Sequence, residues 1–294
     1  MRYSSMKAVK LKFKTPIRIG ELGIGLESTS EILHSDTLFN AIANALVDIN
    51  GDLEEFIERI RIGELRISSA FPFSGNTYYL PLPILPYDKK IKAKFVSKDD
   101  FEMLIAGEAI DVKSEDLPYR VFDLPKVSID RVTANTSIYY VSFVRFKRNC
   151  GLYFMVDGNG RGLIKPALNY LEDEGVGGKR TWGLGRFEHE WNDFSIKTPS
   201  NSNAFVTLSL VIPNDLSSIQ YWKPIIRGGW TLKGKQVRKP RMIMASEGSI
   251  FRYTDGGKLL DLDEVVGGFS EEVGHKVFLN GKSFLIPTVV NYGD

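Results

Sequence analysis

The chain has 294 residues, of which 43% are hydrophobic, and a formal net charge of +2. This length fits one large domain or two of ordinary size with a packed core. No apolar run approaches the roughly 20 residues of a membrane span, and the N-terminus lacks the apolar stretch of a signal peptide. The lone Cys150 excludes an internal disulfide and a cysteine-based zinc site. We therefore expect a cytoplasmic protein with no metal, no cofactor and no membrane association.

The first half of the chain predicts strands and helices in alternation. Residues 6–14 alternate apolar and polar side chains, which is typical of a half-buried strand. Residues 35–49 carry apolar side chains at helical spacing, with Ser35 suited to the N-cap and Asp36 to the first turn. Residues 98–109 predict a short helix after two strands.

The next segments predict a long hairpin and then a second helix and strand. Residues 126–146 read as strand, polar turn and strand, with "TANTS" as the turn. Residues 150–158 predict another strand, and residues 163–175 predict a helix that ends at Gly175. The order strand, helix, strand, strand, helix, strand, with insertions, is that of a ferredoxin-like sheet.

A change of composition at residues 197–203 predicts a boundary between two units, 1–197 and 198–294. The second unit starts with a strand at "AFVTLSLVI" and is richer in strands than the first. Near its end, Asn280 and Gly281 lie between apolar runs, a pattern that predicts a hairpin turn. We expect an α+β fold with antiparallel sheets, in which the second unit is a degenerate ferredoxin-like relative of the first.

Positive charge is concentrated late in the chain. From Lys223 to Arg241 there are seven Lys or Arg residues and no acid. A segregated basic surface on a nearly neutral chain indicates a polyanionic partner, although a solvated charged face explains the charge equally well. Aromatic residues between these cations favour single-stranded RNA. The candidate contacts in this segment are Arg227, Lys235, Arg238, Lys239 and Arg241.

The segment "EGVGGKRTWGLGRF" joins the second predicted helix to a strand. It is not a P-loop, because Lys179 is followed by Arg180 rather than Ser or Thr and the order of helix and strand is reversed. Its glycines allow close approach to a ligand, its cations suit phosphates, and Trp182 offers a stacking surface. The alternative is a glycine-rich turn with exposed cations. The candidate RNA contacts are Gly175, Gly177, Gly178, Lys179, Arg180, Thr181, Trp182 and Gly183.

The segment "HSDT" at residues 34–37 admits three interpretations. His34 and Asp36 could act as base and acid in RNA cleavage, the segment could simply cap a helix, or the helix start could contact an anion. We favour a cap combined with an anion contact through His34 and Ser35, because the sequence shows no second catalytic group nearby.

The predicted hairpin carries Arg131 near its tip, beside aliphatic and aromatic residues. An ordinary hairpin explains this pattern. A hairpin that presses an apolar side chain between bases and pairs Arg131 with a phosphate explains it equally well. No Ser-His-Asp order, catalytic cysteine setting or paired carboxylate motif stands out in the sequence.

Four segments in order resemble the RAMP superfamily of CRISPR systems: "SDTLFNAI", "KVSIDRVTANTSIYY", "GVGGKRTWGLGRF" and "GGW…RKP…EGSIF". More narrowly, the chain resembles the Csm-type subunit of type III-A effector complexes that holds the 5′ handle of the crRNA. The resemblance implies two ferredoxin-like (RRM-like) units with a projecting β-hairpin thumb that contains Arg131. It also implies that residues 34–37 and 175–185 face RNA and that the late cations lie near the handle.

The same resemblance implies partners and a function. The subunit would dock on the large polymerase-like subunit and on the first copy of the backbone RAMP subunit, which in this family cuts target RNA with an acid near the start of its first helix. Asp36 falls in a comparable place, whereas Trp182 stands where the family has a small residue. We expect a non-catalytic RNA-binding subunit. The alternatives are a metal-independent endoribonuclease that processes CRISPR transcripts with His34 as base, and a pure assembly scaffold.

Overall fold

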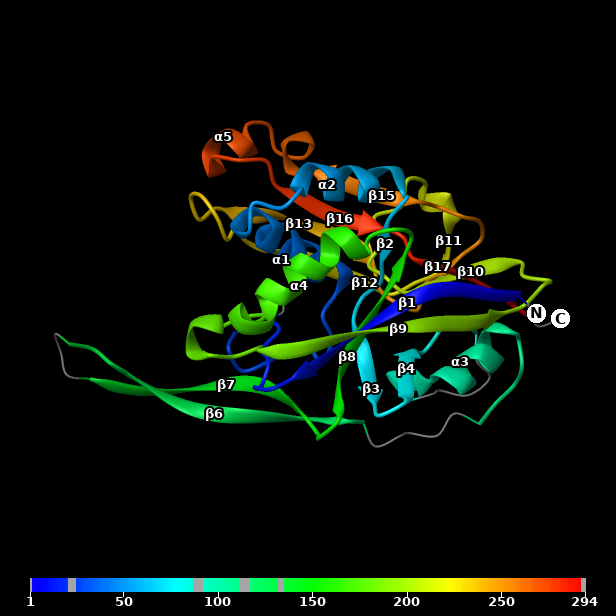
Figure 1. The fold of residues 1–294 in the computed structure, drawn as a ribbon, viewed down its shortest axis with the longest axis horizontal. Coiled ribbons are helices and arrows are strands. Elements are labelled where there is room, and N and C mark those ends of the chain that lie inside the picture. Colours follow the sequence, from blue (N-terminus) through cyan, green and yellow to red (C-terminus); the bar gives the residue numbers. More distant parts are fainter. Residues whose placement is uncertain (1, 21–24, 87–91, 112–116, 132–134, 292–294) are drawn as a thin grey trace.

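The first unit is built on a seven-stranded antiparallel sheet with the order β5-β4-β3-β8-β1-β9, in which β2 also pairs with β8. The structure is a computed structural model that describes residues 2–20, 25–86, 92–111, 117–131 and 135–291 (Figure 1). The elements of this unit besides one long hairpin are β1 (Arg2–Phe13), α1 (Ser35–Asp48), α2 (Leu53–Ile62), β2 (Arg66–Ile67), β3 (Phe71–Ser74), β4 (Thr77–Pro81), β5 (Phe95–Ser97), α3 (Lys98–Ile105), β8 (Cys150–Asp157), α4 (Arg161–Glu174) and β9 (Phe187–Thr198).

Four of these strands form the ferredoxin-like arrangement. In chain order they are β1, β3, β8 and β9, with α1 in the first crossover and α4 in the second. Their order in the sheet is β3-β8-β1-β9, with all neighbours antiparallel. This confirms the α+β, ferredoxin-like fold that the strand and helix order predicts.

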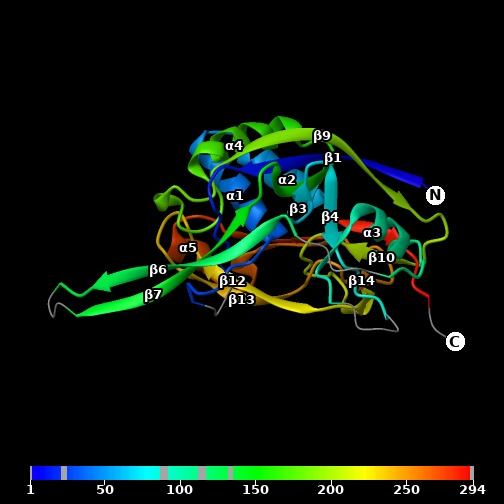
Figure 2. The same ribbon diagram turned by 90° about the horizontal axis from the view of Figure 1, so that it is seen from below.

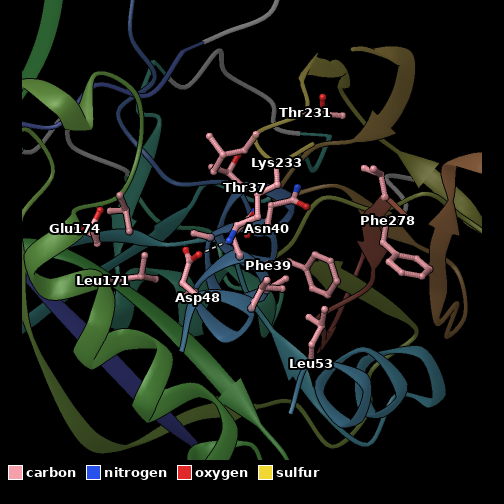
Figure 3. Close-up of a pocket in the computed structure, with 18 of the residues that line it drawn as sticks. Thr37, Phe39, Asn40, Asp48, Leu53, Leu171, Glu174, Thr231, Lys233 and Phe278 are labelled. Atoms are coloured by element: carbon pink, nitrogen blue, oxygen red, sulfur yellow. Dashed lines mark hydrogen bonds and ion pairs between the residues drawn. The ribbon is translucent and has the colours of Figure 1, made fainter. Parts of the chain in front are cut away.

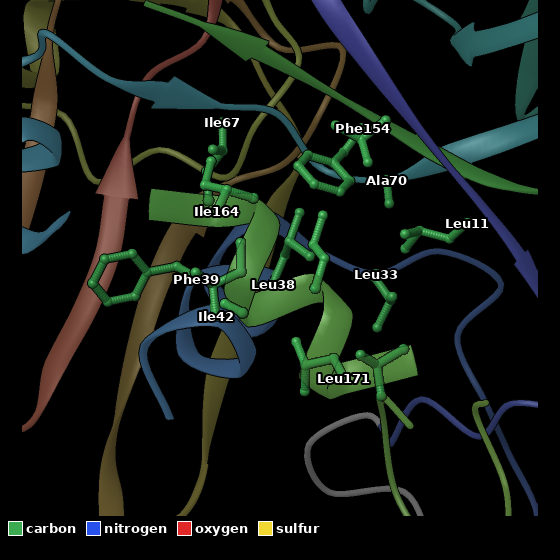
Figure 4. Close-up of a cluster of buried hydrophobic side chains, with 14 of the residues drawn as sticks. Leu11, Leu33, Leu38, Phe39, Ile42, Ile67, Ala70, Phe154, Ile164 and Leu171 are labelled. Atoms are coloured by element: carbon green, nitrogen blue, oxygen red, sulfur yellow. The ribbon is translucent and has the colours of Figure 1, made fainter. Parts of the chain in front are cut away.

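The central strands are buried on both faces. On one face, Leu11 of β1 and Phe154 of β8 pack against α1 and α4, whose Leu38 and Ile164 are fully buried (Figure 4). Each such side chain contributes about 1.5–3 kcal/mol when it leaves water. The other face carries Ala8 and alternate residues of β8, and it is covered by α3 and by strands of the second unit. The prediction that β1 is half-buried is therefore wrong.

The hairpin of β6 (Tyr119–Ile129) and β7 (Thr136–Phe146) projects far from the body of the molecule (Figures 1 and 2). At its base, β7 forms a bridge from Val144 to Ile17, and Ser142 N donates to Leu26 O at 2.9 Å. Towards the tip both strands are exposed. This projecting hairpin agrees with the thumb that the family resemblance implies. Of its predicted turn, Thr133 and Ala134 lie outside the described residues, whereas Thr136 and Ser137 belong to β7.

The second unit repeats the strand order of the first in reduced form. Its four-stranded antiparallel sheet has the order β11-β14-β10-β17, which again places the second, third, first and fourth strands of the unit side by side. No α-helix fills the crossover from β10 to β11. The elements are β10 (Ala204–Thr207), β11 (Ile219–Tyr221), β12 (Pro224–Trp230), β13 (Arg238–Ala245), β14 (Ile250–Phe251), β15 (Gly257–Asp261), α5 (Phe269–Val273), β16 (Phe278–Lys282) and β17 (Leu285–Thr288).

The hairpin turn predicted at Asn280 and Gly281 is wrong. Both residues lie inside β16, where they pair with Leu259 and Lys258 of β15. The glycine serves close packing instead, because a Cβ at position 281 would lie 2.6 Å from Cγ1 of Ile212.

The two units share an apolar core. Val206 and Ile286 of the second unit belong to the same buried cluster as Ala8 and Met155 of the first. The strand β9 ends at Thr198 and β10 begins at Ala204, so the connection between the units is short. The exact boundary at residue 197 stays a prediction. None of the described helices is both long enough and apolar enough to cross a bilayer.

Candidate nucleic-acid interface

A groove of about 1360 Å³ lies between α1, the end of α4 and the second unit. Thr37, Asn40 and Asp48 of α1 line it on one side, and Glu174 of α4 lies across from them (Figure 3). Lys233 of the second unit closes it from a third direction and forms an ion pair with Asp48.

Two predicted segments that lie far apart in the sequence meet at this groove. Both the glycine-rich loop and the end of the β12–β13 ribbon contribute to its wall. The predicted contacts among its lining residues are Gly175, Gly177, Gly178, Lys179, Arg180, Thr181 and Lys239. Trp182 and Gly183 follow directly in the chain, at the end of the glycine-rich loop.

The glycines of this loop first serve the loop's own packing. Gly175 ends α4 with a φ of +79°, and Gly177 has a φ of +88°. A Cβ at Gly177 would lie 2.5 Å from the carbonyl oxygen of Arg18, so a larger residue would push the two main chains apart. Gly178 N donates to that same oxygen at 2.7 Å. The loop is thus preformed, and the predicted close approach to a ligand is sterically open at Gly178 and Gly183.

Unpaired cations gather around Trp182, which is 43% exposed. The Nζ atom of Lys179 lies 4.9 Å from the centroid of its ring, and the Nζ atom of Lys126, from β6, lies 5.0 Å from it. Within the described parts of the chain, no carboxylate pairs with Lys126, Lys179 or Arg180. This rim therefore presents positive charge that the protein does not neutralise.

Lys126 was not a predicted contact. Its place beside the glycine-rich loop depends on how the long hairpin leaves the sheet. In the sequence, only its positive charge within a predicted strand could have suggested Lys126 as a contact.

The start of α1 is held by a buried ion pair with the second unit. Arg227 Nε donates to Asp36 Oδ2 at 2.8 Å, and Arg227 Nη2 donates to Asp36 Oδ1 at 3.0 Å and to Thr37 Oγ1 at 2.8 Å. Burial alone would raise the pKa of Asp36, but the charge and hydrogen bonds of Arg227 outweigh it and hold this pKa below its usual value. Arg227 is 8% exposed and joins the two units through Asp36, and its contact with RNA stays a prediction.

His34 and Ser35 are also enclosed by the second unit. His34 Nδ1 lies 2.8 Å from Glu247 Oε1, and Ser69 Oγ donates to the same carboxylate. Burial alone would raise the pKa of Glu247, but His34 and Ser69 outweigh it and hold this pKa below its usual value. Ser35 Oγ accepts a hydrogen bond from Leu210 N at 3.0 Å, and Ser35 N donates to Ser69 Oγ.

The predicted N-cap at Ser35 is wrong, because His34 is the N-cap residue and it makes no side-chain capping bond. The second unit packs over this end of the helix. The anion contact of His34 and Ser35 stays a prediction.

Comparisons with known proteins agree with this architecture. The family model of the RAMP superfamily matches residues 10–188, and that of the CRISPR Csm4 C-terminal domain matches residues 200–288. The CRISPR system Cms protein Csm4 of Thermococcus onnurineus is 36% identical over 94% of both chains. This chain belongs to the Csm4 family of the RAMP superfamily. The Csm4 protein of Methanocaldococcus jannaschii is 27% identical over 96% of this chain and 97% of its own length.

Solved structures of Csm4 proteins share the fold. The crystal structure of a Csm1-Csm4 cassette in complex with cA4 contains a chain that is 30% identical, with a TM-score of 0.73 over 99% of this chain and 100% of that one. A chain in the Csm3-Csm4 subcomplex of a type III-A interference complex has a TM-score of 0.62 at 22% identity, over 97% of this chain and 99% of that one. As a member of the Csm4 family, this chain is a RAMP subunit of a type III CRISPR complex.

The remaining predicted contacts of this Csm4-family chain occupy different places. Lys239 lies partly buried beside the Asp36–Arg227 pair, and burial lowers its pKa against the opposing effect of Asp36. Arg238 and Arg241 are exposed on β13, whereas Lys235 is exposed and 3.4 Å from Glu272. Arg131 is exposed just beyond the end of β6. Of these residues only Lys239 lines the groove, and together they do not form one compact patch.

Proposed function

We propose that this chain is a non-catalytic subunit that holds the 5′ handle of the crRNA in the groove between the glycine-rich loop and the β12–β13 ribbon. One observation carries the proposal: two separately predicted RNA-binding segments line the same groove, and unpaired cations gather at its rim. Phosphate contacts would supply much of the affinity, while exposed aromatic surface at Trp182 and Trp230 would allow bases to stack.

The proposed lack of catalysis is supported by the surroundings of the two groups that the nuclease alternative requires. Asp36 is 4% exposed and bound through both oxygens by Arg227, and His34 is 6% exposed and bound to Glu247. A general base must reach the proton that it removes from the substrate. Neither group is in reach of a strand in the groove, so we favour binding over cleavage.

The partners follow from the family. Solved structures contain Csm4 proteins together with Csm1, the large subunit, and with Csm3, the backbone RAMP subunit. We infer that this chain bridges the same two kinds of subunit in a type III-A complex. Its two β-ribbons expose apolar side chains of the kind that such contacts cover: Val127, Ile129, Ile138, Ile226 and Ile243.

The experiment compares the double variant Lys179→Ala/Arg180→Ala with the wild-type full-length chain. Binding of a fluorescently labelled, single-stranded handle RNA is measured over a series of salt concentrations. Each lost phosphate contact lowers the slope of log affinity against log salt by about 0.7, so we expect a decrease of about 1.4. The matched control is Lys165→Ala/Arg252→Ala, which removes two exposed cations outside the groove. Equal slopes for all three proteins would contradict the proposal.

A further inference from the structure

Arg18 is a buried cation to which none of the described residues gives an acidic partner. Its side chain lies beneath the glycine-rich loop and is 7% exposed. The Nη2 atom donates to the carbonyl oxygens of Gly25 at 3.1 Å and Ser28 at 3.4 Å. The Nε atom is buried without a hydrogen-bond partner, and in the part of the chain that the structure describes no carboxylate pairs with this guanidinium.

Burying a cation without an acidic partner in this way lowers the stability of the folded protein. Buried charges are normally paired, because a carbonyl oxygen compensates only part of the lost hydration. Arg227 shows the usual solution in the same molecule, since it is equally buried but held by both oxygens of Asp36. An arginine stays protonated even where burial disfavours its charge. Arg18 therefore needs a counter-anion, and none of the described residues supplies one.

The guanidinium lies directly behind the wall of the groove. Gly20 and Gly178 both line the groove. A Cβ built on Gly178 would lie 3.6 Å from Arg18 Nη1, and one built on Gly20 would lie 3.1 Å from it. No side chain of these two residues therefore separates the guanidinium from the groove.

The fold alone does not explain glycine at position 178. Its φ is not in the left-handed region, and a Cβ there would make only ordinary contacts. This contrasts with Gly177, where both the φ of +88° and the approach to Arg18 O exclude a side chain. The approach of a ligand to Arg18 at this point would explain the glycine.

We propose that Arg18 binds a backbone phosphate of the RNA through Nη1, the atom nearest to Gly20 and Gly178, at the opening that these two glycines would leave. The inference rests on the proposed function and adds to it a buried phosphate subsite beside the half-buried Lys179 and Arg180. An arginine suits this role because its guanidinium stays charged when buried and makes charge-assisted hydrogen bonds to phosphate oxygens. The phosphate would supply the missing counter-charge.

The decisive variant is Arg18→Met in the full-length chain, tested with the labelled handle RNA. We expect the affinity to fall roughly tenfold and the salt slope to fall by about 0.7, the value for one phosphate contact. We expect thermal stability to hold or rise, because a buried unpaired charge has been removed. A loss of thermal stability with an unchanged salt slope would show that Arg18 only holds residues 25–28 in place by hydrogen bonds, and it would overturn the proposal.

A second variant, Gly178→Ala, keeps Arg18 and narrows the opening. We expect weaker RNA binding with an unchanged melting temperature, and unchanged binding would overturn the proposal even if Arg18→Met failed to fold.

Two control variants match the changes at Arg18 and Gly178. Lys10→Met removes another buried cation, whose Nζ donates to Gly75 O, and Gly162→Ala adds a methyl group on α4 outside the groove. Neither control is expected to change RNA binding.

The outcomes separate this inference from the proposed function. If Lys179→Ala/Arg180→Ala weakens binding while Arg18→Met and Gly178→Ala do not, the subsite is wrong and the groove still binds RNA. If the wild-type chain gives no salt-dependent binding of handle RNA, the proposed function and the subsite fail together.

Discussion

The two inserted β-ribbons occupy equivalent places in the two units, but only one of them packs against the body of the molecule. Each follows the second strand of its ferredoxin-like unit and precedes the third: β6–β7 comes between β3 and β8, and β12–β13 between β11 and β14. The first projects into solvent, with Ile129 and Ile138 about two-thirds exposed at 65% and 66%. The second lies against the body of the molecule (Figure 2), with Arg227 and Met244 buried.

The difference shows that anchoring, rather than topology, decides where a ribbon lies. One face of β12–β13 carries Arg227, which is bound to Asp36 in the first unit, and Met244, which joins a buried cluster. The distal part of β6–β7 has no equivalent attachment within the described residues, and its contact with the glycine-rich loop is the pair of the half-buried Lys126 and the exposed Trp182. The loop thus contacts a free ribbon on one side and shares the groove with an anchored ribbon on the other.

The largest expected effect comes from breaking the anchor. Arg227→Ala leaves Asp36 buried without its counter-charge, so we expect a loss of about 3–5 kcal/mol in the free energy of unfolding, measured in urea. Arg241→Ala, an exposed change in the same ribbon, is the control and should stay within about 0.5 kcal/mol of wild type. Equal free energies of unfolding for the two variants would show that the Asp36–Arg227 ion pair does not stabilise the fold.

A smaller effect is expected where the glycine-rich loop packs on the main chain. Gly177→Ala combines a φ of +88° with a Cβ 2.5 Å from Arg18 O, and we expect it to cost about 1–3 kcal/mol of stability. Gly178→Ala is the neighbouring control and should leave the urea midpoint unchanged, because its Cβ fits. Equal destabilisation by both would show that the loop needs glycine throughout.

Acidic pH should weaken the anchored ribbon selectively. The pKa of Asp36 is lower in the folded protein than in the unfolded chain, so its contribution is complete above the usual carboxyl pKa and is lost as pH falls through the folded value. Below about pH 4 the wild type should therefore lose up to about 1.4 kcal/mol per pH unit more than the double variant Asp36→Asn/Arg227→Met. Urea unfolding at several pH values measures this, and parallel curves for the two proteins would speak against the ion pair.

The smallest effect on stability is expected in the projecting ribbon. Ile138→Ser should change the free energy of unfolding by less than about 0.5 kcal/mol, because the side chain is already 66% exposed. The matched change on the anchored ribbon is Ile243→Ser, which is 60% exposed and should behave alike in the isolated chain. A cost above 1 kcal/mol for Ile138→Ser would mean that the thumb packs on the body in solution.

Features set by local sequence could be predicted. Helical spacing and turn residues predicted α1, α3, α4 and the long hairpin, and their order predicted the ferredoxin-like sheet. Features set by distant parts of the chain could not. The strand β1 resembles a half-buried strand because one of its faces is covered by α3 and by strands beyond residue 198. Asn280–Gly281 resembles a turn although both residues pair with β15 inside β16.

The same division between local and distant features applies to the candidate site. The glycine-rich loop and the basic segment were identified from composition, and the structure brings both to one groove. The sequence could not show that Arg227, one of several similar cations, pairs with Asp36 across 191 positions. Nor could it show that Arg18, an unremarked residue in a loop, lies buried behind that groove.

The central claim is that RNA lies between the glycine-rich loop and the anchored ribbon. Its most direct test is to map crosslinks between bound crRNA and peptides of this chain in the assembled effector complex. The account predicts crosslinks from the handle to residues 175–183 and 230–241. Handle crosslinks confined to other surfaces, with both of these segments unlabelled, would contradict it.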